Sequence, residues 1–261
     1  MIQSFDYKHC KIAYSVVGRG RTLVFLHGFL ERSNMWDGIA AALKNRFRIL
    51  CIDLFGHGGS ENFGYIHTME EQADMVKAVT SSLGLRRFVL IGHSMGGYVG
   101  LAFAKKYSKN LRGFVLMNST ALADSPEKFN NRNRAIKAVK QNHELFLQIA
   151  IPMLFSEKNR DSCSETIKIL IEEAKSMSPQ GIVASLEGMK IRKERTSVYQ
   201  LESLPMAMVI GKQDPVLDHQ ALKTQIENTH VQSIELSEGH MSHLENSEEI
   251  IHFLKKFINS L

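Results

Sequence analysis

The sequence contains little of what marks secreted, membrane-spanning or disulfide-stapled proteins. Its 261 residues include only three cysteines, Cys10, Cys51 and Cys163. An odd number without metal-ligand spacing argues against a disulfide framework and is typical of a reducing compartment. The N-terminus has no basic start followed by an apolar core, so we expect no signal peptide. No apolar run approaches membrane-spanning length. We therefore expect a cytoplasmic protein without a membrane partner.

The excess of charge of one sign is also small, because 32 basic and 27 acidic residues leave a net charge of only +5. The densest basic cluster alternates with apolar residues at helical spacing, which indicates a solvated helix face rather than a nucleic-acid patch. It consists of Arg132, Arg134, Lys137 and Lys140. No glycine-rich phosphate loop is present, and no His, Cys, Asp or Glu residues have metal-ligand spacing. The sequence thus predicts no nucleic-acid partner, no metal and no cofactor.

What the sequence does contain is an alternation of short apolar strands and helices. Strands are predicted at residues 10–17, 22–26, 47–52, 88–91, 113–117, 206–210 and 231–236. One of the helices between them begins with a capping box at Thr68 and Glu71. This alternation predicts an α/β fold, in which a mostly parallel sheet is covered by helices on both faces. Reactive groups in such folds gather beyond the carboxyl ends of the strands.

Residues 122–203 interrupt the alternation, because they predict helices only. Helix starts are indicated at Ser125-Pro126, at Ser162 with Glu165, and at Ser178-Pro179. A block of roughly 80 residues is too long for a plain connection. We expect an inserted all-helical cap above the strand ends, with residues 1–121 and 204–261 forming the core domain.

The most informative motif is Gly92-His93-Ser94-Met95-Gly96, which has the pattern G-x-S-x-G. It lies between the predicted strand 88–91 and a helix of small residues. A sharp strand-to-helix turn holds a serine oxygen away from the backbone and next to backbone N–H donors. The five residues alone fit a glycine-rich turn with a capping serine equally well.

A serine nucleophile needs a general base, and the base needs an orienting acid. Asp214 follows the predicted strand 206–210, and His240 follows the strand 231–236. Both side chains therefore lie just beyond strand ends, in the chain order serine, acid, histidine. His243 is a rival base three residues further on. Asp53 also follows a strand, and we expect it to support the neighbouring turn.

These features resemble the α/β-hydrolase fold superfamily along nearly the whole chain. The matching signatures are Leu26-His27-Gly28-Phe29, residues 53–60, residues 92–97, Gly211-Lys212-Gln213-Asp214 and Gly239-His240. The resemblance implies that Ser94 is the nucleophile, His240 the base and Asp214 the orienting acid. It also implies an oxyanion hole formed by the backbone N–H groups of Phe29 and Met95.

The resemblance implies a serine hydrolase that cleaves a carboxylic ester or related small acyl compound through an acyl-enzyme. Serine at position 94 excludes epoxide hydrolases and haloalkane dehalogenases, which carry aspartate there. Met241 disfavours a carbon–carbon hydrolase, which often has an aromatic residue after the histidine. A lactonase, a thioesterase, a cofactor-free perhydrolase or a non-catalytic ligand receptor remain alternatives. Phe29, Met153 and Phe155 are candidates for substrate contact, although the latter two fit ordinary cap core equally well.

Overall fold

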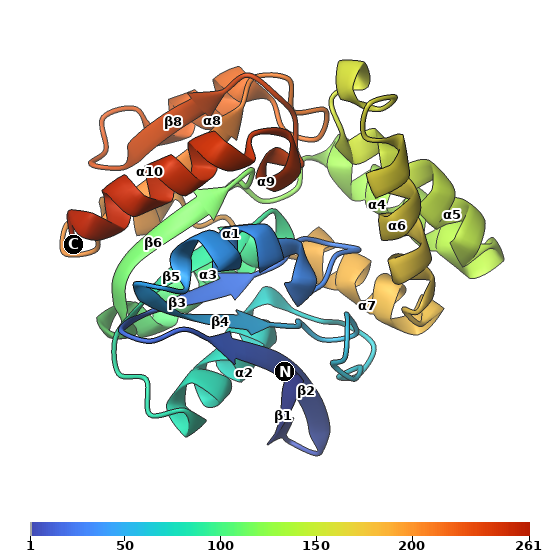
Figure 1. Cartoon of the computed structure of the whole chain (residues 1–261). Coiled ribbons are helices and arrows are strands. Elements are labelled where there is room, and N and C mark those ends of the chain that lie inside the picture. The colour runs from blue at the N-terminus through green and yellow to red at the C-terminus, as the bar shows by residue number, and fades with distance from the viewer. Residues whose placement is uncertain (1) are drawn as a thin grey trace.

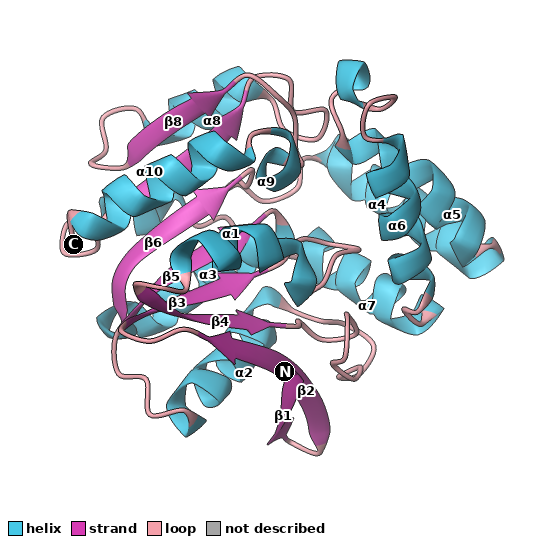
Figure 2. Cartoon of the chain, in the orientation of Figure 1, coloured by secondary structure: helices cyan, strands magenta, loops and turns pink. Residues whose placement is uncertain are grey.

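The computed structural model describes residues 2–261. Their strands form one eight-stranded sheet, which is surrounded by helices (Figures 1 and 2). The strand order is β1-β2-β4-β3-β5-β6-β7-β8. The strands are β1 (Ile2–Tyr7), β2 (Cys10–Val17), β3 (Arg21–Leu26), β4 (Phe47–Ile52), β5 (Phe88–His93), β6 (Leu111–Met117), β7 (Met206–Gly211) and β8 (Gln232–Leu236). The pairs from β4 to β8 are parallel, whereas β2 pairs antiparallel with β1 and β4. The predicted fold class is confirmed, although sequence patterning missed β1.

Side chains alternate along the central strands, and this alternation produces a hydrophobic core on each face of the sheet. In β3, Val24 and Leu26 belong to the core with α2 (Met69–Ser82) and α3 (Met95–Tyr107). Leu23 and Phe25 belong to the core with α1 (Asp37–Leu43) and α10 (Ser247–Asn259). Trp36 is fully buried 4.9 Å from the Phe25 ring, as expected of a core residue.

Four helices occupy most of the segment between β6 and β7. They are α4 (Pro126–Gln141), α5 (His143–Ala150), α6 (Ser164–Lys175) and α7 (Pro179–Lys190). Figure 1 shows them grouped beyond the carboxyl ends of the parallel strands. Two predicted starts are confirmed, because Ser125 and Ser178 accept backbone N–H bonds at the beginnings of α4 and α7. The predicted start at Ser162 is wrong, because its hydroxyl donates to the Asn159 carbonyl and α6 begins two residues later.

The remaining helices complete the covering of the sheet. The capping box is confirmed, since the Thr68 hydroxyl accepts the Glu71 N–H at the beginning of α2. The C-terminal region adds α8 (His219–Ile226), α9 (Ser242–Glu245) and α10, and α10 packs beside α1. Among residues 2–261, no helix has both the length and the apolar character needed to span a membrane.

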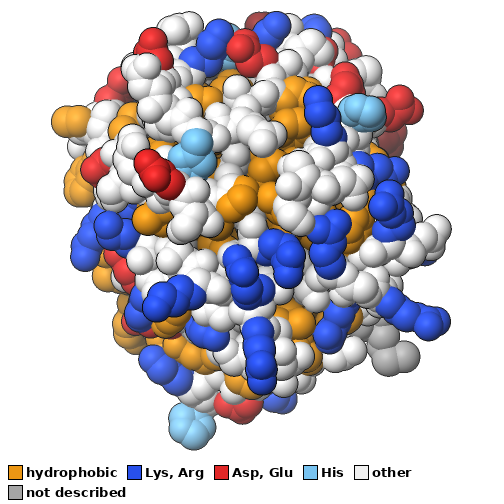
Figure 3. Space-filling model, turned by 90° about the vertical axis from the view of Figure 1, so that its left-hand side faces the viewer, with side chains coloured by type: hydrophobic (Ala, Val, Ile, Leu, Met, Phe, Trp, Pro, Cys, Tyr) orange, Lys and Arg blue, Asp and Glu red, His pale blue; other side chains and the backbone are white. Residues whose placement is uncertain are grey.

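Basic side chains from sequence-distant loops share the edge of the sheet at which the parallel strands begin. Figure 3 shows Lys and Arg side chains spread over this face. The exposed cations in the loops that precede β3 to β6, or at the starts of those strands, are Arg19, Arg21, Lys44, Arg46, Arg86, Arg87, Lys109 and Arg112. Because reactive groups in parallel sheets gather at the opposite edge, this basic face lies away from the predicted site.

Candidate active site

The predicted turn at Ser94 joins β5 to α3 in an unusual backbone conformation. Ser94 has φ 49° and ψ −112°, a combination that costs conformational energy for a residue with a Cβ. Gly96 allows the tight approach of α3 to β3, because a Cβ there would lie 2.4 Å from the Leu26 carbonyl oxygen. The turn thus holds the serine at the carboxyl end of β5, directly before the first turn of a helix.

Ser94, His240 and Asp214 come together above the carboxyl ends of three strands. His240 Nε2 lies 2.9 Å from Ser94 Oγ, and His240 Nδ1 lies 2.8 Å from Asp214 Oδ2. The side chains of His240 and Asp214 are 3% and 0% exposed. A neutral imidazole that donates from Nδ1 to the carboxylate leaves Nε2 to accept the serine proton.

Asp214 is held in place by four hydrogen-bond donors. Oδ1 accepts the N–H groups of Val216 and Leu217, and Oδ2 accepts His240 Nδ1–H and the Asn118 amide. Burial alone would raise the pKa of Asp214, but the electrostatic interaction with His240 and these hydrogen bonds outweigh burial and lower it. The carboxyl group is therefore ionised and fixed in orientation.

Asn118 was missed by sequence reasoning, although its place directly after β6 was a signal. Besides Asp214, its amide donates to the Gly239 carbonyl at 3.0 Å. Its side-chain oxygen accepts the Ser242 hydroxyl. Asn118 adopts φ 45°, which asparagine tolerates better than most residues. It therefore connects the acid to the loop that carries the histidine.

The backbone N–H groups near Ser94 include two that have no hydrogen-bond partner among residues 2–261 and that belong to predicted site residues. These residues are Phe29 and Met95, which the resemblance implied for an oxyanion hole. Met95 is the first residue of α3, where a helix leaves its N–H groups unpaired. The neighbouring N–H groups of Gly28 and Leu30 are bonded, to Glu31 Oε2 and to His57 Nε2. Unpaired donors of this kind can bind an anionic oxygen.

A buried ion pair that sequence reasoning missed lies directly behind His240. His93 Nδ1 is 2.9 Å from Glu31 Oε2, and His93 Nε2 is 2.9 Å from the His240 carbonyl oxygen. Because both partners accept, His93 donates from both nitrogens and is the imidazolium. Burial opposes both charges, but each partner outweighs it: the pKa of Glu31 falls to about 2, and the pKa of His93 is raised.

This ion pair joins three parts of the site. Glu31 Oε2 also accepts the Gly28 N–H at 2.9 Å, so it fixes the segment that contains Phe29. His93 precedes the serine, and its second N–H holds the backbone of His240. His93 therefore supports both the serine turn and the loop of His240. Its partner Glu31 had no recognisable signal, because the two residues are 62 positions apart.

His243, the rival base, is directed toward this ion pair. Its Nε2 lies 3.5 Å from Glu31 Oε1, and its ring centroid lies 5.3 Å from that of His93. Burial lowers the pKa of His243 to about 4, so the imidazole is neutral. Since His240 and not His243 is hydrogen-bonded to Ser94, the geometry favours His240 as the base. The possible ligand atoms of Glu31, His93 and His243 lie within 4.8 Å of one another, but His93 donates from both ring nitrogens and has no lone pair left for a metal ion.

Asp53 and His57 support the turn between β4 and α2. The Asp53 carboxylate accepts the N–H groups of Ser33 and Gly59, at 2.7 and 2.9 Å. His57 Nδ1 lies 2.9 Å from the Phe55 carbonyl oxygen. The contacts of Asp53 agree with the supporting role expected for it, and His57 stabilises the same turn.

Two cavities that share lining residues lie on this side of the protein, and the inner one reaches Ser94. The inner cavity has a volume of about 110 Å³ and is lined by Ser94 and His240, among others, and the outer cavity has about 400 Å³. Both are lined by Phe29, Tyr98, Arg132, Ala150, Leu154 and Val216. Met153 lines the outer cavity only.

Two expectations about this region are corrected by the structure. Phe155, predicted to contact substrate, is fully buried and lines neither cavity. It follows the short turn Pro152–Leu154, and its side chain packs into the hydrophobic core instead. Arg132, predicted to lie on a solvated helix face, has a side chain only 18% exposed and lines both cavities.

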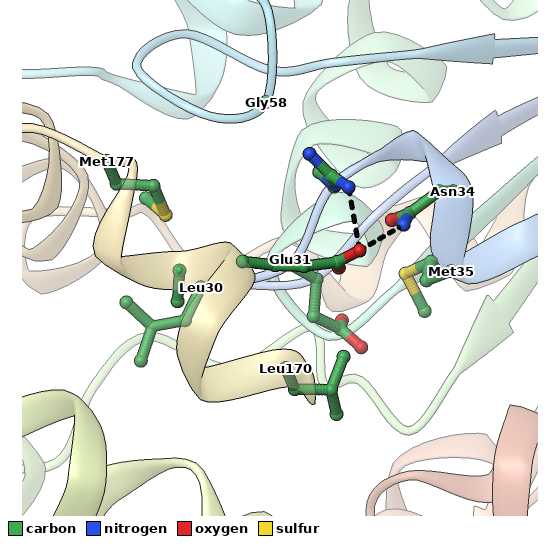
Figure 4. A pocket seen from close by; sticks show the side chains of 10 residues that line it. Leu30, Glu31, Asn34, Met35, Gly58, Leu170 and Met177 are labelled. Carbon is green, nitrogen blue, oxygen red and sulfur yellow. Dashed lines mark hydrogen bonds and ion pairs between the residues drawn. The ribbon is translucent and has the colours of Figure 1, made fainter. Parts of the chain in front are cut away.

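A polar contact fastens α6 to the segment that follows Phe29 (Figure 4). The side chains of Arg32 and Asn34 both donate to Glu173 of α6, at 2.6 and 2.8 Å. A small pocket beside this contact is lined by Leu30 and Met35 together with Leu170 and Met177 of the helical segment. The position of α6 is therefore coupled to the loop that carries one of the unpaired N–H groups.

Several known proteins share sequence with this chain. The monoacylglycerol lipase ABHD6 of Bos taurus is 24% identical over 280 residues, covering 98% of this chain and 80% of that protein. Most of the other relatives match over a shorter region, so that the chain covers between 31% and 41% of their length. Fluoroacetate dehalogenase of Burkholderia sp, for example, is 30% identical over 112 residues, covering 40% of this chain and 36% of that protein.

Comparison with solved structures and with family models agrees with the geometry. A thermophilic esterase from Thermogutta terrifontis, solved with malate bound, superimposes with a TM-score of 0.89 at 28% identity, covering 100% of this chain and 98% of that one. The model of the alpha/beta hydrolase fold family matches residues 21–247. Since that match includes the serine turn, the acid and the histidine in their expected order, the chain belongs to the α/β hydrolase fold family.

Proposed function

We propose that this protein is a serine hydrolase that cleaves a carboxylic ester through an acyl-enzyme. The observation that carries the proposal is the continuous hydrogen-bonded series Ser94–His240–Asp214, with contacts of 2.9 and 2.8 Å, beside two unpaired backbone N–H groups. Solvated serine is a poor nucleophile, and this series provides a base for its proton and an acid to stabilise that base.

In the proposed reaction, Ser94 Oγ attacks the ester carbonyl as His240 Nε2 takes the hydroxyl proton. The N–H groups of Phe29 and Met95 bind the developing oxyanion, and Asp214 stabilises the imidazolium. His240 then donates the proton to the departing alkoxide, which leaves an acyl-enzyme. Water activated by His240 attacks the acyl carbonyl, releases the acid and restores the serine.

We also propose that residues 122–203 form a cap over a core made of residues 1–121 and 204–261. Support comes from the cavity linings, because Arg132 and Leu154 of this segment line the same cavities as Phe29 and the serine. The cap would enclose a small acyl substrate, with Phe29 and Met153 in contact with it. The esterase and lipase among the relatives favour ester substrates over lactones, thioesters or carbon–carbon bonds.

The proposal is tested by replacing Ser94 with alanine. Hydrolysis of p-nitrophenyl butyrate should fall at least about 10,000-fold, because the nucleophile is removed. A fluorophosphonate probe followed by peptide mapping should modify Ser94 in the unmodified protein. The matched control is Ser81→Ala on the exposed face of α2, which should retain full activity and labelling. An undiminished rate in Ser94→Ala, or labelling confined to another residue, would overturn the proposal.

A further inference from the structure

The cavity that adjoins Ser94 contains a guanidinium with unused donors. Arg132 of α4 lines both the inner and the outer cavity. Of the five N–H groups of an arginine, Nε and one on Nη2 donate to Asp124, and one on Nη1 lies 3.5 Å from the thioether sulfur of Met189. A thioether is a weak acceptor. Within residues 2–261, two N–H groups of Arg132 therefore lack a protein acceptor.

The charge around Arg132 is not balanced within the protein. Its partner Asp124, whose side chain is 1% exposed, also accepts Arg192, whose side chain is 3% exposed. Two guanidinium groups thus share one carboxylate, which leaves an excess of one positive charge. The Arg192 guanidinium lies 4.1 Å over the ring of Tyr98, and Tyr98 itself lines both cavities.

The other residues around the cavities do not supply the missing negative charge. The outer cavity has two cationic side chains in its lining, Lys128 and Arg132, and no carboxylate. The inner cavity has one carboxylate, Glu31, which His93 already neutralises. Apart from the cations the outer lining is mostly apolar, and it includes Ala135, Phe146, Ala150, Met153 and Leu186.

We propose that the substrate is an ester of a dicarboxylic acid that carries a free carboxylate at the end of its acyl chain, and that Arg132 binds this carboxylate. This inference rests on the serine hydrolase function proposed above. A partly buried, unbalanced cation favours an anionic ligand, and arginine presents paired N–H groups that match a carboxylate. The inner cavity is lined by both Arg132 and Ser94, and its apolar side chains, among them Phe29, Leu154 and Val216, can contact the methylene chain that separates the two ends of such a substrate.

Arg132 can be replaced without leaving a buried charge unpaired. If glutamine stands at position 132, Asp124 and Arg192 remain as a neutral one-to-one pair. We therefore expect Arg132→Gln to fold, which separates recognition of substrate from stability. The matched control is Arg134→Gln on the same helix, since Arg134 is exposed and its side chain hydrogen-bonds only to Asn131 among the residues that the structure describes.

The test compares two esters of equal chain length, monoethyl adipate and ethyl hexanoate, in a titrimetric assay. The unmodified protein should have the higher kcat/KM for monoethyl adipate. In Arg132→Gln this value should fall about 10- to 100-fold, mainly through KM, because a charge-assisted hydrogen bond is lost. Its kcat/KM for ethyl hexanoate should change less than about threefold, and Arg134→Gln should change neither. Higher ionic strength should narrow the preference in the unmodified protein.

The outcomes distinguish this inference from the function on which it rests. Suppose that the unmodified protein hydrolyses ethyl hexanoate but does not prefer the anionic ester, or that Arg132→Gln keeps this preference. Either result would overturn the carboxylate site and leave the hydrolase proposal standing. Absence of both turnover and fluorophosphonate labelling would count against the hydrolase proposal itself. In that event calorimetry on Ser94→Ala still tests the carboxylate site. Binding of monoethyl adipate to Ser94→Ala that is lost in Ser94→Ala/Arg132→Gln would support the site. Failure of Ser94→Ala to bind monoethyl adipate would overturn it.

Discussion

Replacing Glu31 by glutamine tests whether the buried ion pair behind His240 holds the site together. The substitution keeps the volume of the side chain and removes its charge. In the structure Glu31 Oε2 accepts both the Gly28 N–H and His93 Nδ1–H, each at 2.9 Å. The glutamine oxygen can occupy the same position, but it cannot neutralise an imidazolium. His93 then either stays charged in a buried site or loses one of its two protons.

Each of these outcomes has a cost that can be bounded. If His93 becomes neutral, it loses its hydrogen bond to position 31 or to the His240 carbonyl, and a lost bond to a charged group costs about 1.5–3 kcal/mol. If it stays charged, breaking a buried pair costs about 3–5 kcal/mol. We therefore expect Glu31→Gln to lower the free energy of unfolding by about 2–4 kcal/mol.

The same change should slow the reaction without weakening substrate binding. Glu31 fixes Gly28 directly and His240 through His93, so its loss displaces the proposed oxyanion donor Phe29 and the proposed base His240 together. Small displacements of such groups cost about 10- to 100-fold in rate. We expect kcat to fall by that factor while KM changes less than about twofold. A purely structural role would not separate these two constants.

Urea unfolding and steady-state kinetics of Glu31→Gln, His93→Gln and the double variant provide the measurement. The double variant should be less destabilised than the sum of the single variants by at least about 1 kcal/mol, because the charge left unpaired in one is absent from the other. Glu165→Gln, on an exposed glutamate of α6, is the control. The reasoning would be refuted by a Glu31→Gln protein with unchanged kcat and an unfolding free energy within about 0.5 kcal/mol of the original.

Three further predictions follow from the geometry. Ser94→Gly should be about 1 kcal/mol more stable than Ser94→Ala in thermal unfolding, because glycine relieves the strain at φ 49°, and equal melting temperatures would argue against strain. Gly96→Ala should lower the free energy of unfolding by at least about 3 kcal/mol, because its Cβ would meet a carbonyl oxygen of β3. The control is Gly38→Ala in α1, where the added Cβ has open space, and it should leave the free energy of unfolding unchanged or slightly raised. Burial lowers the pKa of His67 and His243 from 6.5 to about 4, so the unfolded chain binds more protons between those values and stability falls as pH decreases from 6.5. At pH 5 each histidine should cost about 2 kcal/mol relative to pH 8, and an unchanged urea midpoint over that range would contradict the prediction.

The sequence by itself determined the fold class and the three residues of the hydrogen-bonded series. Strand and helix patterns depend on residues a few positions apart, so they are legible along the chain. Parallel strands also bring their carboxyl ends to one edge. For this reason Ser94, Asp214 and His240 could be expected together, although His240 lies 146 positions from the serine.

Only the tertiary structure decided how charges and side chains are partnered around that site. The contacts from Glu31 to His93 and from His93 to His240 span 62 and 147 positions, and neither has a local pattern. Helical spacing likewise could not tell that Arg132 turns inward toward Asp124 while Phe155 packs into the core. The orientation of one helix against its neighbours sets such choices, because burial makes an unpaired charge costly and an apolar side chain favourable.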